Sequence, residues 1–160
     1  MDPLGFSPHN HDHCISDGVA AADAQCRAKG LQLTPVRRRV LEILLQEHRA
    51  MGAYDILDHL RNEGLGSQPP VAYRALDFLV KHGFAHKIER LNAFVACAHP
   101  EGDHAPVFLI CRDCNSVAES DGRTVRKAMA DTASQSGFAI DRSVVEALGL
   151  CPNCREGHAE

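Results

Sequence analysis

The 160-residue sequence predicts an α+β fold divided into two units. Apolar residues recur at helical spacing up to residue 83, and short strand-like runs follow. Charge changes in the same region: residues 27–92 carry 11 basic and 7 acidic side chains, and residues 93–160 carry 6 and 10. Only the second half is flanked by two Cys-x-x-Cys pairs, Cys111 with Cys114 and Cys151 with Cys154. We therefore expect two units with different partners, the basic one facing an anion such as DNA.

Composition limits the class of protein. The chain is 44% hydrophobic and 24% charged, which is typical of a soluble globular protein. No run of eighteen apolar residues predicts a membrane span, and residues 1–14 have neither the basic start nor the apolar stretch of a signal peptide. A cytoplasmic protein with no membrane partner is expected. In that reducing compartment, paired cysteines bind metal more often than they form disulfides.

The first 19 residues are rich in His, Asp, Pro and Gly and show little periodicity, so residues 1–19 are expected to form a flexible tail. The tail contains four metal-capable side chains, His9, His11, His13 and Cys14. Incidental ligands in a flexible segment are the favoured interpretation, and a weak metal-loading arm is the alternative. The first helix is expected over about residues 20–29, because this Ala-rich stretch ends near Gly30.

Three further helices are predicted from capping residues and apolar spacing. The second helix begins at Thr34-Pro35, with Thr as N-cap and Pro in the first turn. Its expected inner face consists of Val36, Val40, Leu41, Leu44 and Leu45. The third helix covers about residues 53–62, ends at Gly64 and turns inward Ile56, Leu57 and Leu60. The fourth begins at Pro69-Pro70, ends at Gly83 and is expected to bury Leu76, Leu79 and Val80.

A hairpin is predicted next, from the strand-like residues 84–88 and 93–97 around the turn Arg90-Leu91-Asn92. Three short helices followed by a hairpin make a winged helix, in which one helix enters the major groove of DNA. In this chain it is the helix after Pro70. The sequence therefore predicts a winged-helix DNA-binding domain at residues 20–97 and a hinge at residues 98–104.

A small C-terminal α/β domain is predicted at residues 105–160. Its expected strands are residues 107–110, 117–119, 138–140 and 144–148. Residues 121–135 are expected to form an amphipathic helix, with one side made of Val125, Ala128, Met129 and Thr132. A unit of this size has little core, so a metal ion or a partner subunit is expected to stabilise it.

The two Cys-x-x-Cys pairs are separated by 36 residues. Each pair presents two sulfurs to one ion, and two pairs complete the tetrahedron of a structural zinc site. Such a zinc ties the two ends of the C-terminal unit together, so its binding free energy becomes folding free energy. The alternative is a thioredoxin-like redox pair, which needs only one Cys-x-x-Cys at the start of a helix.

More metal-capable residues lie around the junction of the two units: His86, Cys97, His99, Asp103, His104 and Glu119. Imidazole, thiolate and carboxylate donors together suit zinc, and the thiolate argues against manganese or magnesium. As a set, these residues are compatible with a second tetrahedral site. For each residue taken alone, an ordinary surface or core role is the simpler interpretation.

An enzyme is the competing class of function. Zinc deaminases carry His-x-Glu followed by Pro-Cys-x-x-Cys, and His99-Pro100-Glu101 matches the first part. Neither Cys pair follows a proline, however, and His99 lies only twelve positions before Cys111. No nucleophile elbow, phosphate-binding loop or HExxH motif is present. We therefore expect a protein that is not an enzyme and has no small-molecule substrate.

Together with the two Cys pairs, three segments resemble the ferric uptake regulator family of bacterial metalloregulators: 31-LQLTPVRRRVLEIL-44, 53-AYDILDHLR-61 and 69-PPVAYRALDFLVKHGFAHKIE-89. The similarity spans roughly residues 20–155 and is strongest to the zinc-uptake branch of the family. It implies a homodimer with an N-terminal winged helix and a C-terminal α/β dimerisation domain, whose zinc-loaded form binds double-stranded operator DNA and represses zinc uptake genes. A sibling regulator that senses iron, manganese or peroxide is the alternative, and a structural zinc adaptor without DNA binding is a more distant one.

The resemblance also implies a regulatory zinc site. Its ligands carry over to His86, Cys97, His104 and Glu119, where the local motifs match. With the four-cysteine site, this gives two Zn²⁺ per subunit. Since His86 comes from the DNA-binding side and His104 and Glu119 from the dimerisation side, zinc is expected to fix the hinge and the spacing of two recognition helices. The segment 98-AHPEGDHA-105 has fewer histidines than the iron and peroxide branches, which favours zinc.

For DNA contact, the best candidates are Tyr73 and Arg74, because an arginine can fork onto guanine. Phosphate contacts are expected from Tyr54, Arg37, Arg38 and Arg39. A solvated helix face is the alternative for the arginines, and a half-buried position for Tyr54. Val71-Ala72 stand where the family commonly has Thr-Val, so a hydroxyl that caps the helix or touches phosphate is missing. Asp58 and Arg61 are expected to pair with each other, and pairing between neighbouring dimers on DNA is a weaker idea.

Overall fold

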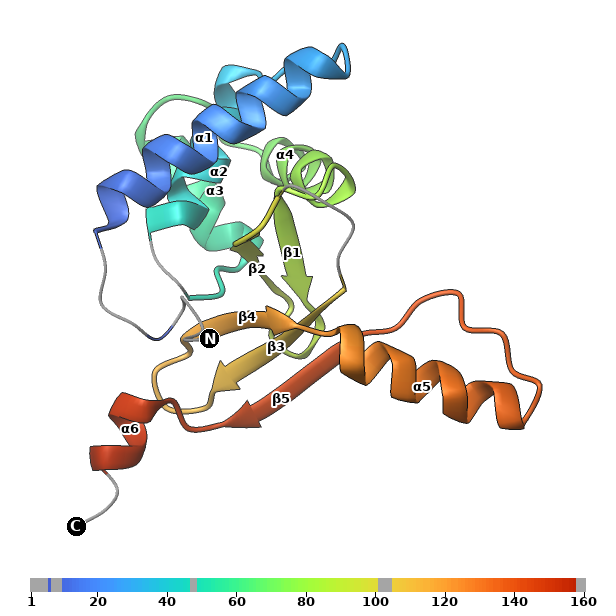
Figure 1. Cartoon of the computed structure of the whole chain (residues 1–160). Coiled ribbons are helices and arrows are strands. Elements are labelled where there is room, and N and C mark those ends of the chain that lie inside the picture. The colour runs from blue at the N-terminus through green and yellow to red at the C-terminus, as the bar shows by residue number, and fades with distance from the viewer. Residues whose placement is uncertain (1–5, 7–9, 47–48, 101–104, 158–160) are drawn as a thin grey trace. The chain divides into compact units, whose positions relative to one another are not determined.

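The computed structural model describes residues 6, 10–46, 49–100 and 105–157. Apart from residue 6, these divide into two compact units, an N-terminal unit of residues 10–100 and a C-terminal unit of residues 105–157 (Figure 1). Helices and two small sheets confirm the α+β class. Within the described ranges, no helix is long and apolar enough to cross a membrane. Part of the expected hinge, residues 101–104, lies outside these ranges.

Helix α1 spans His11–Ala28 and begins well before the helix expected at residue 20. The expectation of a flexible tail is therefore wrong for residues 11–19. Asn10 caps the helix, because its side-chain oxygen accepts the N–H of Asp12 at 2.9 Å. The inner face of the helix is formed by three buried residues at helical spacing, Val19, Ala22 and Cys26. Residues 11–19 are therefore the N-terminal part of one helix, whose inner face packs into the hydrophobic core.

The other helices of the N-terminal unit are α2 at Pro35–Gln46, α3 at Ala53–Asn62 and α4 at Pro69–Lys81, as predicted. Gly64 and Gly83 follow α3 and α4 with φ of 70° and 79°, the left-handed conformation that ends a helix. The expectation that Val80 is buried is wrong, because its side chain is 37% exposed. The small residues Ala72 and Ala75 take inner positions of α4 instead, which lets α4 pack closely on its neighbours.

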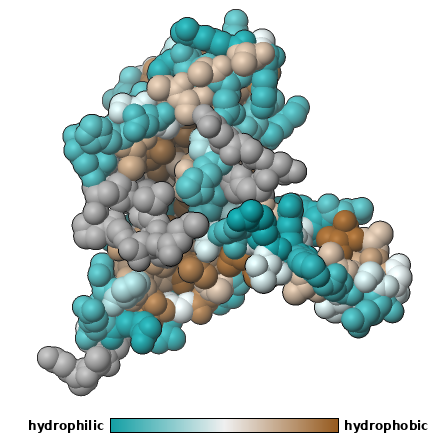
Figure 2. All heavy atoms as spheres, in the orientation of Figure 1, coloured by the Kyte–Doolittle hydropathy of each residue, from teal (hydrophilic) through white to brown (hydrophobic). Residues whose placement is uncertain are grey.

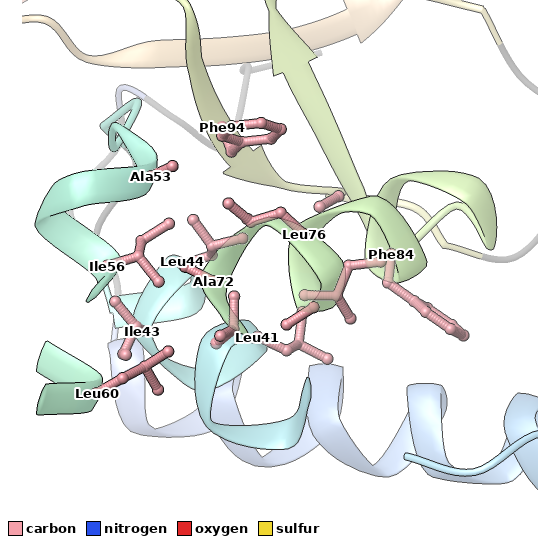
Figure 3. Packing of buried hydrophobic residues seen from close by; sticks show 14 of the residues in the cluster. Leu41, Ile43, Leu44, Ala53, Ile56, Leu60, Ala72, Leu76, Phe84 and Phe94 are labelled. Atoms are coloured by element: carbon pink, nitrogen blue, oxygen red, sulfur yellow. The ribbon is translucent and has the colours of Figure 1, made fainter. Parts of the chain in front are cut away.

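One hydrophobic core joins α1 to α4. Figure 3 shows Leu41 and Leu44 of α2 beside Ile56 of α3 and Leu76 of α4. Each of these four side chains is at most 3% exposed. Burying a leucine or isoleucine contributes roughly 1.5–3 kcal/mol, so this cluster gives the N-terminal unit its own source of stability.

A hairpin follows α4. Strand β1 (Ala85–Ile88) pairs antiparallel with β2 (Ala93–Ala96), and the 3₁₀ turn η1 (Glu89–Leu91) joins them. Asn92 closes the turn with a φ of 47°. Met51 adds an isolated bridge to Phe94, with N–H···O distances of 2.9 and 2.8 Å. Three helices and this hairpin confirm the expected winged helix.

The C-terminal unit has a three-stranded sheet in the order β4-β3-β5, formed by β3 (Pro106–Cys111), β4 (Val117–Asp121) and β5 (Val145–Gly149). Strand β3 pairs antiparallel with β4 and parallel with β5. The parallel connection passes through α5 (Arg123–Gln135), and α6 (Pro152–Gly157) follows β5. Residues 138–140 form no strand, contrary to expectation, and Phe138 is 67% exposed.

Helix α5 is amphipathic as expected, but little of its apolar side is buried in the single chain. Among its described residues only Ala133 is buried, and Val125 is 37% exposed. The expected inner side, which included Val125, Ala128, Met129 and Thr132, is therefore not covered within one chain. This face, with the edge strand β5, leaves apolar surface available for another molecule.

Candidate metal centres and nucleic-acid interface

The four paired cysteines meet at one end of the C-terminal sheet. Cys111 ends β3 and Cys114 follows it in a turn, while Cys151 follows β5 and Cys154 lies on α6. The parallel register of β3 and β5, with Cys111 opposite Gly149, brings the two pairs to the same end of the sheet. A backbone hydrogen bond from the N–H of Arg112 to the Gly149 carbonyl, at 2.9 Å, continues this pairing.

One ligand atom from each cysteine lies within 4.8 Å of all the others. The Sγ atoms of Cys114 and Cys151 are 3.8 Å apart. The turn after β3 is closed by two backbone hydrogen bonds, Asn115 N–H to the Cys111 carbonyl at 3.0 Å and Cys111 N–H to the Ser116 carbonyl at 2.9 Å. Asn115 adopts a φ of 58°, which a residue with a short polar side chain tolerates. The first pair is thus folded into a tight turn, whereas the second pair lies at the start of α6, and the four ligand atoms converge.

Electrostatics of the cluster favour a cation. Burial opposes ionisation of Cys111, but the N–H groups around it, first that of Cys114 and then those of Cys151 and Asp113, lower the pKa of its thiol to about 6. At the other extreme, the Cys151 side chain and then burial raise the pKa of Cys154 to about 12. Four thiols at this spacing cannot all lose their protons unless a positive ion compensates the charge.

Zinc fits this donor set. Two pairs that present two sulfurs each match the four-thiolate donor set of structural zinc sites, and the Cys111 and Cys151 side chains are buried. A thioredoxin-like pair would require a single Cys-x-x-Cys at the start of a helix. The first pair follows a strand, and the second pair, which does lie at the start of α6, converges with it. The metal-binding interpretation is therefore the better one.

A second pair of donors lies on the wing. His86 is in β1, opposite Val95 of β2, and Cys97 follows β2, where its N–H donates to the Phe84 carbonyl at 2.9 Å. A ligand nitrogen of His86 and the Sγ of Cys97 lie within 4.8 Å of each other. The Cys97 side chain is 6% exposed. A nitrogen and a sulfur donor therefore stand together in a mostly buried position of the N-terminal unit.

Of the other candidate ligands near the junction, one lies in the C-terminal unit, one is exposed and two lie outside the described residues. Glu119 lies on β4 of the C-terminal unit, where it is half-buried opposite Phe108. His104 and Asp103 lie outside the described residues. His99 is exposed. Among the described candidate ligands, His86 and Cys97 are the two that lie close together within one unit.

Of the metal-capable N-terminal residues, His11 begins α1, and His13 and Cys14 lie in its first turns. His13 is exposed and Cys14 is half-buried. Burial, and then the charge of Asp17, raise the pKa of Cys14 above its ordinary value. This disfavours the thiolate form that binds metal. His9 lies outside the described residues.

The expected DNA-reading residues stand on exposed faces of α3 and α4. Tyr73 is 41% exposed and Arg74 is also exposed, both in the first half of α4. Tyr54, at the start of α3, is 63% exposed, which does not support the half-buried alternative. These positions are suited to contact with an extended polyanion. Val71 and Ala72, which precede Tyr73, are half-buried and buried.

The three consecutive arginines of α2 contact protein groups. Arg37 donates to the Gln32 carbonyl at 2.7 Å, and its guanidinium lies 3.8 Å from the centre of the Phe78 ring. Arg38 pairs with Asp23 at 3.4 Å. Arg39 pairs with Glu63 at 2.7 Å and with Glu42 at 3.1 Å. Similarly, Arg61 pairs with Asp58 at 3.2 Å, as expected from their spacing.

Sequence reasoning missed one residue of the four-cysteine site. A hydrogen bond of 3.1 Å joins Cys114 Sγ to Ser116 Oγ, and it is the main cause that lowers the pKa of the Cys114 thiol. The residue two positions beyond a Cys-x-x-Cys pair is within reach of the second sulfur when the turn folds back. A hydroxyl at this position was therefore the signal available in the sequence.

Comparison with known proteins gives consistent results. The model of the ferric uptake regulator family matches residues 28–147. The zinc uptake regulation protein of Escherichia coli K12 is 39% identical over 142 residues, which cover 88% of this chain and 83% of that protein. Its namesake from Mycobacterium tuberculosis H37Rv is 25% identical over 131 residues, which cover 80% and 98%.

Two solved structures are also similar. A zinc uptake regulator complexed with zinc and DNA superposes with a TM-score of 0.87 at 37% identity, over 91% of this chain and 98% of that one. The holo form of XcZur superposes with a TM-score of 0.79 at 40% identity, over 88% and 98%. In both cases the similarity extends over most of the two units.

Proposed function

This chain belongs to the ferric uptake regulator family, and on that premise we propose that it is a zinc-responsive, DNA-binding transcriptional repressor of zinc uptake genes. The observation that carries the proposal is the His86–Cys97 donor pair on the wing of a unit whose α4 exposes Tyr73 and Arg74. A metal bound at this pair acts on the unit that reads DNA. Relatives are named for zinc uptake regulation, and one was solved with zinc and DNA, which supports zinc as the signal and operator DNA as the partner.

Each subunit holds two Zn²⁺ in this proposal. The structural ion is bound by Cys111, Cys114, Cys151 and Cys154, supported by the convergence of their ligand atoms. The regulatory ion is bound by His86, Cys97, His104 and Glu119. For the first two the support is their proximity, and for the last two it is the match to the family's motifs. One thiolate with imidazoles and a carboxylate is a donor set that zinc accepts.

Zinc responsiveness follows from which halves of the chain supply the regulatory ligands. A zinc ion held by the wing and by residues 104 and 119 restricts the hinge between the two units. Without the ion, the arrangement that binds DNA is one of many. The apparent affinity is then the intrinsic affinity multiplied by the fraction of molecules that adopt this arrangement. In a two-fold dimer, this restriction sets the separation of two recognition helices, which must match about one turn of DNA.

A homodimer is supported by the apolar surface of the C-terminal unit (Figure 2). Its exposed large hydrophobic residues are Val125, Phe138, Ile140, Val144 and Leu148. Strand β5 is also an edge of its sheet, and an apolar edge strand pairs readily with another strand. A second copy of the chain that covers this face would bury these side chains and give a small unit the core it lacks.

Membership of this family also defines the class of activity. The family consists of regulators, so the zinc ions are assigned to structure and sensing and not to chemistry on a substrate. We place the protein in the cytoplasm, where operator DNA is accessible. A sibling that senses iron, manganese or peroxide is less well supported: the ferric uptake regulation protein of Bordetella parapertussis is 24% identical, against 39% for the Escherichia coli zinc regulator. The buried Cys97 thiol also argues against manganese.

The experiment that tests the function follows zinc and DNA binding in the same samples. Zinc per subunit is measured before and after mild chelation. In the same samples, DNA binding is measured with a duplex that the zinc-loaded protein has selected from a random pool. We expect chelation to remove one zinc per subunit and leave the other bound. DNA binding should be lost together with the zinc that is removed. Zinc should then restore binding, and Fe(II) or Mn(II) should not. A single zinc and DNA binding that ignores chelation would contradict the proposal.

A further inference from the structure

Arg39 makes a closely packed set of contacts at the turn that leads into the recognition helix α4. Its Nε donates to Glu63 Oε2 at 2.8 Å and its Nη2 donates to Glu63 Oε1 at 2.7 Å, the parallel fork that arginine forms with a carboxylate. Its Nη1 donates to Glu42 Oε2 at 3.1 Å. Glu63 is the residue that follows α3. The fork therefore joins α2 to the end of α3.

This end of α3 determines where α4 starts. Only residues 63–68 separate α3 from α4, and we call them the α3–α4 turn. Within the turn, Gly64 is left-handed, and Leu65 N–H donates back to the Leu60 carbonyl at 2.9 Å. Tyr73 and Arg74 follow within the first half of α4. A shift at Glu63 would therefore move the helix that presents both side chains.

Charge argues against a second use of Arg39 as a phosphate ligand. Two carboxylates, of Glu42 and Glu63, surround one guanidinium, so the cluster carries a net charge of −1 and repels an incoming phosphate. The Arg39 side chain is only 26% exposed. Three of its five N–H groups, one on each nitrogen, already donate to these carboxylates. Arg74, in contrast, is exposed on α4.

We infer that Arg39 is a positioning residue for DNA recognition, which fixes the α3–α4 turn through Glu63 and does not itself bind the DNA backbone. This assignment rests on the proposed function, because it concerns how α4 is presented to DNA. It differs from the sequence-based expectation, in which Arg39 contacts phosphate with Arg37 and Arg38. In this assignment, Arg39 acts on DNA binding through Glu63 and the position of α4, without contacting the DNA.

Two substitutions separate the two roles. Arg39→Lys keeps the positive charge but loses the fork, so a phosphate contact would survive it and the clamp on Glu63 would not. The charge exchange Arg39→Glu with Glu63→Arg reverses the pair, which restores the clamp but places a negative charge where a phosphate ligand stood. Arg27→Lys is the matched control, because Arg27 pairs with Asp23 at 3.0 Å on α1, away from the turn.

The probe is the duplex selected by zinc-loaded wild-type protein from a random pool, and its scrambled version measures non-specific binding. Affinity is measured for zinc-loaded variants over a range of salt concentrations, well below each variant's unfolding temperature. We expect Arg39→Lys to weaken binding of the selected duplex by about fivefold, the change that roughly 1 kcal/mol produces. Binding of the scrambled duplex and the slope of affinity against salt should stay unchanged. The charge exchange should recover most of the loss that Arg39→Glu alone causes.

The opposite results would overturn the inference. A phosphate contact predicts that Arg39→Lys binds like wild type and that the charge exchange is worse than either single change. It also predicts that Arg39→Ala makes the salt slope shallower by about 0.9 for each phosphate that the arginine neutralises. A role limited to stability predicts a lower unfolding temperature with an unchanged ratio of selected to scrambled binding. If wild-type protein selects no duplex at all, the proposed function fails first and this inference fails with it.

Discussion

At the scale of single residues, Cys97 is the side chain through which zinc sensing and folding can be separated. It is buried on the wing beside His86 and is not one of the four paired cysteines. Cys97→Ser should leave a folded protein with one tightly bound zinc per subunit. Its affinity for the second zinc should fall by more than roughly 10–100-fold, the loss caused by removing groups that merely support ligands. Zinc-dependent DNA binding should disappear.

Zinc analysis, circular dichroism and fluorescence anisotropy with labelled DNA measure these three properties. Cys14→Ser is the matched control, since Cys14 is a half-buried thiol on α1 outside both proposed sites. The control should retain both zinc ions and DNA binding. Wild-type DNA affinity in Cys97→Ser would remove Cys97 from the sensing site.

Arg74 tests base reading at the same scale. If its guanidinium forks onto a guanine, Arg74→Ala should weaken binding of the selected duplex by about 1–3 kcal/mol and relax preference at one base pair of each half-site. Arg112→Ala removes an equal charge from the C-terminal unit, where Arg112 is exposed. Competition with duplexes substituted at each position measures the preference. Equal losses for all sequences would indicate a phosphate contact instead.

Residue spacing predicted the convergence of the four paired cysteines but not the partners of the arginines on α2. Cys-x-x-Cys repeats specify their own geometry, because each pair needs only a tight turn to present two sulfurs. Arg39 finds Glu63, 24 positions away, only when α2 packs beside the end of α3. The sequence offered no way to distinguish this contact from a solvated helix face. Likewise, the Ser116 contact with Cys114 depends on a turn that folds back.

At the scale of elements, helix ends followed capping residues where these were strong. Pro35 and Pro69 begin α2 and α4, and the glycines Gly64 and Gly83 follow α3 and α4 closely. The start of α1 was missed, because the polar residues near position 11 resemble a disordered segment, whereas the Asn10 cap supports a helix. The apolar residues at 138–140 suggested a strand, but in the structure they have no strand partner. Alternation alone cannot reveal whether a partner is present.

Gly122, between β4 and α5, is an element-scale constraint. Its φ of −96° is ordinary, so conformation does not require glycine. Space does: a Cβ there would collide with the backbone carbonyl oxygen of Ala105. Gly122→Ala should destabilise the C-terminal unit by about 1–3 kcal/mol, as overpacking against rigid groups does. The measurement is denaturant unfolding of the zinc-loaded protein.

Gly149→Ala is the control for this change. Gly149 also lies in the C-terminal unit, at the end of β5, and a Cβ there meets nothing within 4 Å. The control should unfold within about 0.5 kcal/mol of the wild type, as surface substitutions do. Equal stability of both variants would show that the backbone near Ala105 yields without strain.

At the scale of the whole molecule, assembly should depend on the apolar face of the C-terminal unit. Leu148, on the edge strand β5, is 46% exposed in the single chain. Leu148→Asp places a charge in the proposed dimer interface, so we expect the mass to fall from dimer to monomer in sedimentation experiments. DNA binding should weaken strongly, because two linked half-sites no longer act together.

Ser120→Asp serves as its control, because Ser120 is exposed on β4, the opposite edge of the same sheet. It should remain a dimer and retain DNA binding. A monomeric wild-type protein at micromolar concentration, or a dimeric Leu148→Asp variant, would place the subunit interface elsewhere.

The second cysteine pair follows β5, so it is synthesised after most of the chain, and this determines when the four-cysteine site can form. The parallel partner of β3 and the last two thiols leave the ribosome only after α5 has been made. At roughly 5–20 residues per second, Cys111 and Cys114 wait about 2–7 seconds for Cys151 and Cys154. The N-terminal unit has its own core and can fold during this interval. A chain interrupted before residue 151 would therefore have a folded DNA-binding unit but only half of the four-cysteine site. Its C-terminal unit would lack the zinc whose binding stabilises the fold.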